Sequence, residues 1–131
     1  MPHKVFKNEV YSKFDGCCAY CGSPITLKNM QINHIIPIYR GWADLQLERF
    51  KLERGTDELI NLNPSCRVCN KWKSTWTIEQ FRNEIQQQIK RLNERSAGFR
   101  IAKTYGLIQE IKREVKFHFE NIKQSNNEKT T

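Results

Sequence analysis

Two stretches, Cys18-Ala19-Tyr20-Cys21 and Cys66-Arg67-Val68-Cys69, decide the fold of this 131-residue chain. A gap of two residues lets both sulfurs of a pair face one metal ion, and two such pairs complete a tetrahedron. The spacing therefore predicts one zinc ion that closes the 44-residue loop between the pairs. Because four thiolates leave no coordination position open, this zinc is expected to be structural. The alternative is four buried or redox-active cysteines without metal. Cys17 could replace Cys18, but the two-residue spacing favours Cys18.

The composition favours a polyanionic partner. The chain has 22 basic and 14 acidic residues, a formal charge of +8, and nucleic acid is the commonest partner for such a balance. No stretch approaches the roughly 20 apolar residues of a membrane span, so no membrane association is expected. The first residues lack the apolar core of a secretory signal, and five cysteines, an odd number, argue against a disulfide framework. We therefore expect a cytoplasmic protein.

Hydrophobic periodicity and turn signals predict short elements around the cysteine pairs. The expected elements, in chain order, are a helix at residues 4–15, a strand at 30–36, a poorly patterned helix within the long charged connection 39–58 (Ala43 to Arg54), a strand at 59–62, a helix at 66–75, a helix from the capping box Thr77-x-x-Gln80 to the break at 96–98, and a last helix from Ile101 to Ile122. Residues 124–131 are polar and are expected to be disordered.

The loop between the cysteine pairs is too long for an ordinary zinc ribbon, so we expect further structure within it. Asn33-His34 lies on the first expected strand, and Asn61 lies just before the second cysteine pair. Asn70 directly follows that pair and is close to Lys71 and Lys73 on the same expected helix. These polar and basic residues are the candidates for chemistry.

Together these motifs resemble the HNH endonuclease family, in its zinc-containing branch of phage and bacterial type. The matching pieces, in order, are Cys18-Ala-Tyr-Cys21-Gly22, Asn33-His34-Ile-Ile-Pro37, Asn61-Leu62 and Cys66-Arg-Val-Cys69-Asn70-Lys71-Trp-Lys73. The resemblance implies an α+β fold: a ββα-metal core with a four-cysteine zinc site and flanking N- and C-terminal helices. It implies one nuclease domain at residues 1–123, with its core at about 16–76 and its C-terminal helices at 77–123.

The resemblance also implies a reaction, the metal-dependent hydrolysis of DNA phosphodiester bonds. His34 would be the general base, because a neutral imidazole can take a proton from water near pH 7. Asn61 would hold the loop and orient His34. Asn33 and Asn70 stand at the positions that ligate the catalytic Mg²⁺ or Mn²⁺. The residues expected to contact DNA phosphates are Arg40, Arg67, Lys71 and Lys73.

One departure from the family pattern concerns Asn33, where many members carry Asp or another His. An amide oxygen ligates a hard cation without a formal charge, so metal affinity is expected to be weak until DNA phosphate is bound. A carboxylate such as Asp44 would help if it lay nearby.

Two interpretations, base stacking and packing, stay open for Trp42, Trp72 and Trp76. Two interpretations also stay open for a set of basic residues, which either line the path of DNA or solvate a surface loop: Arg40, Arg49, Lys51 and Arg54.

Two rival functions remain beside DNA cleavage. The first is a non-catalytic zinc-stapled module that binds nucleic acid, descended from a nuclease and impaired at Asn33. The second is a zinc-held protein-interaction domain within a phage or defence assembly. A homodimer or a phage or defence-system partner is compatible with all three, as is action in a bacterial or phage-infected host cell. Cleavage of plasmid DNA that depends on a divalent metal would separate the nuclease from its rivals.

Overall fold

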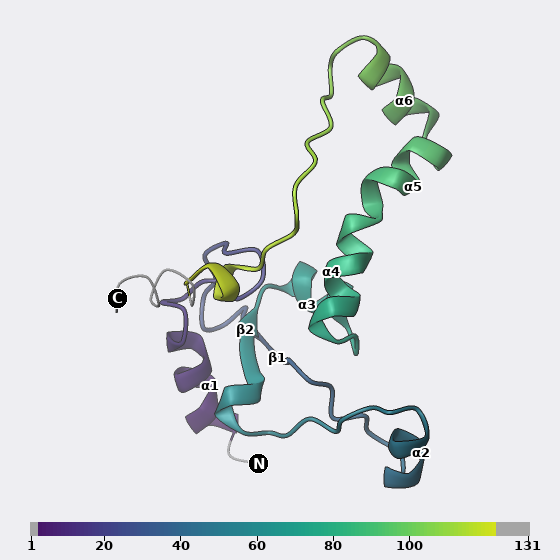
Figure 1. Ribbon diagram of the computed structural model, residues 1–131. Helices are drawn as coiled ribbons and strands as arrows, with labels where there is room; N and C mark the ends of the chain where they lie inside the picture. The colour runs from purple at the N-terminus through teal and green to yellow at the C-terminus, as the bar shows by residue number, and fades with distance from the viewer. Residues whose placement is uncertain (1–2, 123–131) are drawn as a thin grey trace, which may run out of the picture.

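The computed structural model describes residues 3–122, so the tail expected to be disordered at 124–131 lies outside the described residues. Most elements are short, and long segments without regular structure connect them (Figure 1). In chain order they are α1 (His3–Ser12), β1 (Gln31–His34), α2 (Asp44–Arg49), the 3-10 turn η1 (Leu59–Asn61), β2 (Leu62–Ser65), α3 (Arg67–Lys73), α4 (Ile78–Gln86), α5 (Gln88–Arg95) and α6 (Ala97–Thr104). In this described part, no helix is long and apolar enough to cross a membrane.

The two strands form a small antiparallel sheet although they are far apart in the sequence. Gln31 pairs with Ser65, and His34 at the other end pairs with Leu62. The helix α3 follows β2 directly, so the predicted ββα order is confirmed. The second strand, however, was expected at 59–62 and lies at 62–65, after a 3-10 turn. Its sequence, Leu-Asn-Pro-Ser, carries little strand propensity, and complete burial against its neighbours overrides that propensity.

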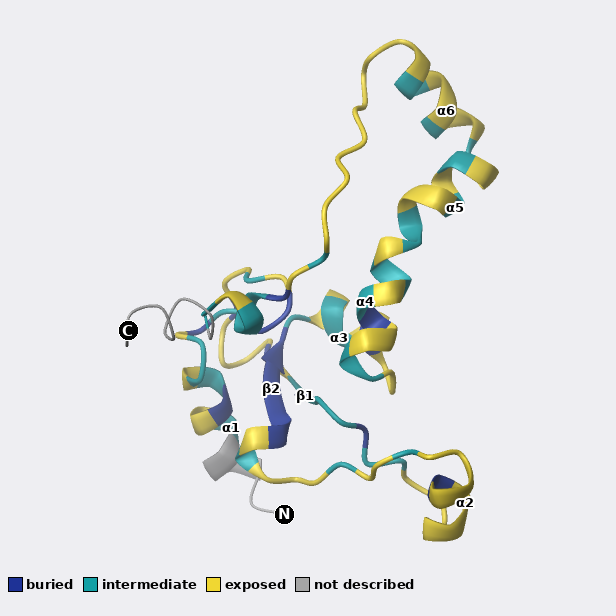
Figure 2. Ribbon diagram, in the orientation of Figure 1, coloured by how far each residue is buried: buried dark blue, intermediate teal, exposed yellow. Residues whose placement is uncertain are grey.

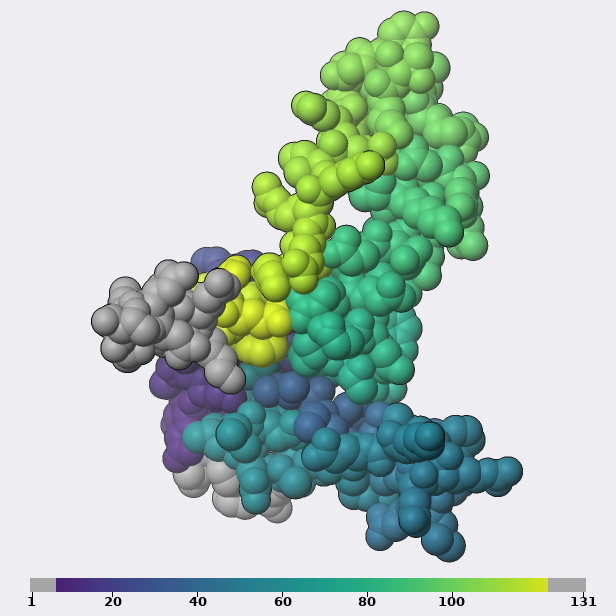
Figure 3. All heavy atoms as spheres, viewed as in Figure 1, coloured from purple at the N-terminus to yellow at the C-terminus, as the bar shows by residue number. Residues whose placement is uncertain are grey.

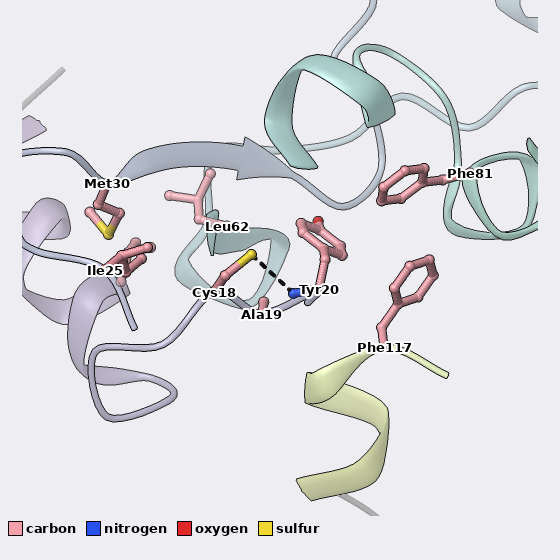
Figure 4. Packing of buried hydrophobic residues seen from close by; sticks show 9 residues of the cluster. Cys18, Ala19, Tyr20, Ile25, Met30, Leu62, Phe81 and Phe117 are labelled. Atoms are coloured by element: carbon pink, nitrogen blue, oxygen red, sulfur yellow. Dashed lines mark hydrogen bonds between the residues drawn. The ribbon is translucent and has the colours of Figure 1, made fainter. Parts of the chain in front are cut away.

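The core surrounds Cys18, the first residue of the first cysteine pair. Cys18 and Ala19 have no exposed surface, and the ring of Tyr20 packs against two phenylalanines that come from distant parts of the chain (Figure 4). Its centroid is 5.7 Å from that of Phe81 and 5.5 Å from that of Phe117, both in edge-to-face geometry. Such aromatic contacts add to the burial of apolar area. Cys18 is therefore packed into the core, whereas its pair partner Cys21 is exposed at the surface.

The helices α4, α5 and α6 form an arm that projects from this core (Figures 1 and 3). Thr77 caps the start of α4 through the predicted capping box, and Ser96 separates α5 from α6 as expected. Burial falls along the arm, and α5 and α6 contain no buried residue, as Figure 2 shows.

The predicted last helix from Ile101 to Ile122 is wrong. The helix α6 ends at Thr104, and Gly106 adopts a left-handed φ of 75°, which ends helical structure. The chain then returns in an extended form to the core and becomes helical again only at residues 118–122. There the backbone N–H groups of His118 and Phe119 donate to carbonyls of the first cysteine knuckle, 3.0 Å and 2.8 Å away. These tertiary contacts override the apolar stripe that suggested one long helix.

Phe117 is expected to carry much of the stability that this return supplies. It is 2% exposed and contacts Tyr20, Phe81 and Phe119. Phe117→Ala should lower the free energy of unfolding by about 3–5 kcal/mol, because it leaves a cavity in the aromatic core. Urea denaturation followed by circular dichroism measures the change. Leu107→Ala, at an 80% exposed position on the same segment, is the control. Equal effects of both substitutions would contradict this role.

Candidate active site

The four predicted zinc ligands converge in space. The sulfurs of Cys18, Cys21, Cys66 and Cys69 all lie within 4.8 Å of one another. Gly22 closes the first knuckle, because its N–H donates to the Cys18 carbonyl at 3.0 Å and its φ is 79°. At the second knuckle the Cys66 sulfur caps α3 by accepting from the Cys69 N–H at 3.4 Å. The predicted cluster is confirmed as a site able to hold one metal ion.

The electrostatics of the cluster favour a bound cation. A hydrogen bond from Cys69 lowers the pKa of the Cys18 thiol to about 4. The same bond raises the pKa of Cys69, and burial raises the pKa of Cys66. Crowded thiolates repel one another, so the protein alone stabilises a negative charge on Cys18 well and on Cys66 and Cys69 poorly. A divalent cation offsets this repulsion and matches the donor set.

Asn33, His34 and Asn70 line one open cleft of about 400 Å³. The first two come from the end of β1, and Asn70 comes from α3, which packs against β1. The segment after β1 also lines this cleft, with Tyr39, Arg40 and Trp42 among its residues. The structure therefore brings the predicted base and both predicted metal ligands to the same place.

The amide of Asn33 is held on both sides. Its Oδ1 accepts from the Tyr20 hydroxyl at 2.7 Å, and its Nδ2 donates to Oδ1 of Asn70 at 3.1 Å. Asn33 is only 4% exposed. A buried amide with both ends bonded is fixed in position, and the first cysteine knuckle supplies one of the partners through Tyr20.

Asn61 fastens the loop that follows His34. Its Oδ1 accepts from the N–H of Ile36 at 2.9 Å. Its Nδ2 donates to the carbonyls of Ile36 and Thr56, at 3.0 Å and 2.7 Å. All of these bonds go to backbone atoms and none to the imidazole, so they act on His34 through the backbone. Gly55 packs on the same segment, where a Cβ would lie 1.8 Å from the Ile36 carbonyl oxygen.

Asp57 is a site residue that was not predicted from the sequence. Its Oδ1 accepts a hydrogen bond of 2.8 Å from Nε2 of His34, and Asp57 is not among the residues that line the cleft. The carboxylate therefore holds one ring nitrogen of an imidazole that itself lines the cleft, which leaves Nδ1 for another partner. Asp57 lies in a charged connecting segment with no motif of its own, so no sequence signal marked it. Asp44, whose carboxylate would have helped to hold the catalytic cation, pairs instead with Arg54 at 3.1 Å.

Comparison with known proteins agrees with this geometry. The model of the HNH endonuclease family matches residues 18–75, which include both cysteine pairs, the sheet and α3. Residues 18–75 form an HNH-type domain. Among solved structures, the Type II-C Cas9 enzyme from Actinomyces naeslundii is similar at 16% identity and a TM-score of 0.48. That match covers 76% of this chain and 11% of the Cas9 chain, so the present chain spans a small part of that enzyme. No curated protein matches.

Three of the four basic residues expected to contact DNA are exposed around the HNH domain. Arg40 lies on the cleft wall, and Arg67 and Lys71 lie on α3. The fourth, Lys73, has no exposed surface, and its Nζ donates to the backbone carbonyl of His34 at 2.7 Å. The predicted phosphate contact of Lys73 is therefore wrong. Lys73 instead links α3 to the end of β1 at His34, a residue that lines the cleft.

Burial makes Lys73 a source of pH-dependent stability. Burial lowers the pKa of the Lys73 ammonium from 10.5 to about 8. Between these two pH values Lys73 is protonated in the unfolded chain and deprotonated in the folded chain. The free energy of unfolding should therefore rise with pH in this window. Relative to Lys73→Met, the wild type should gain up to about 1.4 kcal/mol per pH unit. Urea titrations across the window test this, with Lys71→Met as the exposed control. Parallel curves for wild type and Lys73→Met would rule it out.

Proposed function

We propose that the protein is a metal-dependent endonuclease that hydrolyses DNA phosphodiester bonds, with His34 as general base. The observation that supports it best is the placement of His34. One ring nitrogen is held by Asp57 at 2.8 Å, and the same ring lines a cleft with Asn33 and Asn70. An oriented imidazole beside two oxygen ligands, within an HNH domain, fits hydrolysis of a phosphodiester.

In this proposal His34 takes a proton from water at Nδ1. The Asp57 carboxylate accepts the N–H of Nε2, which keeps the lone pair on Nδ1 and stabilises the imidazolium that forms. The resulting hydroxide attacks phosphorus, so a new P–O bond forms as the bond to the 3′ oxygen breaks. After protonation of the 3′ oxygen, the products carry 5′ phosphate and 3′ hydroxyl ends, as the family resemblance implies.

Asn33 and Asn70 would hold a catalytic Mg²⁺ or Mn²⁺, since their amide oxygens are hard donors at the cleft wall. Such a cation supplies Lewis-acid stabilisation of charge that develops on the phosphate. Asn33 now presents Oδ1 to Tyr20. Because a tyrosine hydroxyl both donates and accepts, the amide can rotate and turn its oxygen to a cation without losing this partner.

The four-cysteine cluster is proposed to hold zinc. A tetrahedral zinc with Zn–S bonds of about 2.3 Å separates its ligand sulfurs by about 3.8 Å. The sulfurs of Cys21 and Cys66 lie 3.8 Å apart. A reducing cytoplasm, as in a bacterial or phage-infected cell, would keep these thiols available to metal.

DNA would be bound chiefly through phosphates, by Arg40 at the cleft and by Arg67 and Lys71 on α3. Residues 1–123 would act as one unit, because the arm and its return are anchored on the cysteine knuckle. One such site cuts one strand at a time, so a double-strand break would require a second copy or a second event.

One observation favours a non-catalytic nucleic-acid-binding module instead. Over the described part of the chain, no carboxylate lines the cleft, so the cation would have only neutral protein ligands there. Incubation of supercoiled plasmid with Mg²⁺, Mn²⁺ or chelator separates the two functions. Nicking that requires the divalent metal supports the nuclease, whereas salt-dependent binding without nicking supports the module.

Substitutions at His34 and Asp57 test the mechanism. His34→Ala should slow plasmid nicking by roughly 10²- to 10⁴-fold, the usual contribution of a general base. Asp57→Asn removes the charge and can donate to Nε2, which favours the wrong tautomer, so a loss of roughly 10- to 100-fold is expected. In the His34→Ala background, Asp57→Asn should have no further effect. The control is Glu58→Gln at the neighbouring exposed position. Independent, additive losses would show that Asp57 does not act through His34.

Removal of one sulfur tests the proposed zinc site. Cys69→Ser should reduce bound zinc and destabilise the fold, because metal-binding free energy is folding free energy at such sites. Zinc content by mass spectrometry under native conditions, and thermal unfolding with and without chelator, measure both effects. Cys17→Ser is the matched control, since Cys17 lies outside the metal cluster. Wild-type protein that contains no zinc and is insensitive to chelator would exclude the site.

A further inference from the structure

We propose that the segment between β1 and η1, residues 35–58, carries an aromatic platform that stacks on an unpaired DNA base beside the cleft. The platform is formed by Tyr39, Trp42 and Phe50. The inference rests on the proposed function and narrows its substrate to DNA with unpaired nucleotides near the scissile phosphate. The platform belongs to the part of the molecule around α2, which projects at the lower right in Figure 3.

The three rings form a continuous row. The centroids of Tyr39 and Trp42 lie 5.7 Å apart, and those of Trp42 and Phe50 lie 5.9 Å apart. Despite these contacts, Trp42 remains 41% exposed and Phe50 62% exposed. The buried apolar residue of α2 is Leu47, at 4% exposure. The rings are therefore held in place while much of their surface stays open to a ligand.

Arg54 fixes the backbone beneath the platform. Its Nη1 donates to the carbonyls of Ile38 and Tyr39, at 2.7 Å and 3.2 Å, and its Nη2 donates to the carbonyl of Trp42 at 2.5 Å. Asp44 neutralises the guanidinium. Because these bonds occupy Arg54, it is a structural residue rather than a phosphate contact. A preorganised aromatic surface loses little conformational entropy when it binds.

Charge and position favour a nucleotide as the occupant. The same segment exposes three basic residues close in sequence to the aromatic row: Arg40, Arg49 and Lys51. Tyr39 and Trp42 line the same cleft as His34, so a strand with one phosphate at His34 would bring an adjacent nucleotide to the platform. Aromatic faces interleaved with cations are the pattern that binds single-stranded nucleic acid.

Pairing state decides whether a base can use the platform. In an intact duplex both faces of each base are covered by its neighbours, and exposing one requires unstacking. A base in a single strand, flap or frayed end already offers a face. Each base–aromatic stack contributes enough free energy for about a 5- to 100-fold change in affinity. The platform therefore predicts preference for DNA with unpaired bases over continuous duplex.

Binding measurements on the full chain test the platform, and they use His34→Ala to slow cleavage. The probes are a fluorescent single-stranded oligonucleotide and its fully paired duplex, titrated at several salt concentrations. Adding Trp42→Ala should weaken single-strand binding by about 5- to 100-fold and leave duplex binding unchanged. The slope of log affinity against log salt should stay the same, because stacking releases no counterions. Arg49→Ala should instead reduce that slope by about 0.7.

Further variants keep the test decisive. Trp72→Ala, at a 47% exposed tryptophan outside the cleft, is the control and should bind both probes normally. If Trp42→Ala perturbs folding, Trp42→Phe should retain single-strand affinity and Phe50→Ala should lose it. Normal single-strand binding by both alanine variants, or equal losses on duplex and single strand, would overturn the platform. Wild-type protein that shows this pattern of binding but never nicks DNA would leave the platform standing and refute the nuclease.

Discussion

The convergence of the sulfurs of Cys18, Cys21, Cys66 and Cys69 is the constraint on which the rest of the structure depends. It joins residues separated by 44 positions and thereby sets the register in which β1 and β2 can meet. Neither strand is long enough to form a stable hairpin alone, and loop closure before pairing carries an entropic cost. A cluster that binds a cation offsets this cost at the two knuckles. Once the two strands pair, α3 is placed beside the sheet because it directly follows β2 in the chain. Residues of β1 and α3 then line the same cleft.

Tyr20 transmits this constraint to both other parts of the molecule. Its ring lies among Phe81, Phe117 and Phe119, which ties the arm and the returning chain to the first knuckle. Its hydroxyl reaches Asn33 at 2.7 Å and so fixes one wall of the cleft. Since Tyr20 stands between two metal-ligand positions, the ring cannot move far without disturbing the sulfurs. Metal binding, core packing and the position of a proposed catalytic ligand are thus three consequences of one local conformation.

The sequence allowed prediction of those features whose spacing is fixed by chemistry. The cysteine pairs, the Asn33-His34 dipeptide and Asn70 are local patterns, and the structure brings them together as expected. Features that depend on tertiary contact were missed. Asp57 reaches His34 from a segment without periodicity, Lys73 looks like a surface cation until α3 is packed against β1, and the chain beyond Gly106 leaves its apparent helical stripe to bond the knuckle. In each case the deciding partner lies more than 20 residues away in sequence.

The lack of a carboxylate among the described residues that line the cleft gives the proposed mechanism an order of assembly. The cleft-lining residues of the described chain contribute Arg40 but no carboxylate, so a cation held by Asn33 and Asn70 would have neutral ligands and a cationic neighbour. A DNA phosphate supplies the negative charge that this arrangement lacks. The affinities of cation and phosphate are then coupled, and the coupling is reciprocal by thermodynamic linkage. A cleft built in this way would hold its catalytic cation mainly when substrate is present, while the four-cysteine cluster, with its own thiolates, would hold a metal at all times.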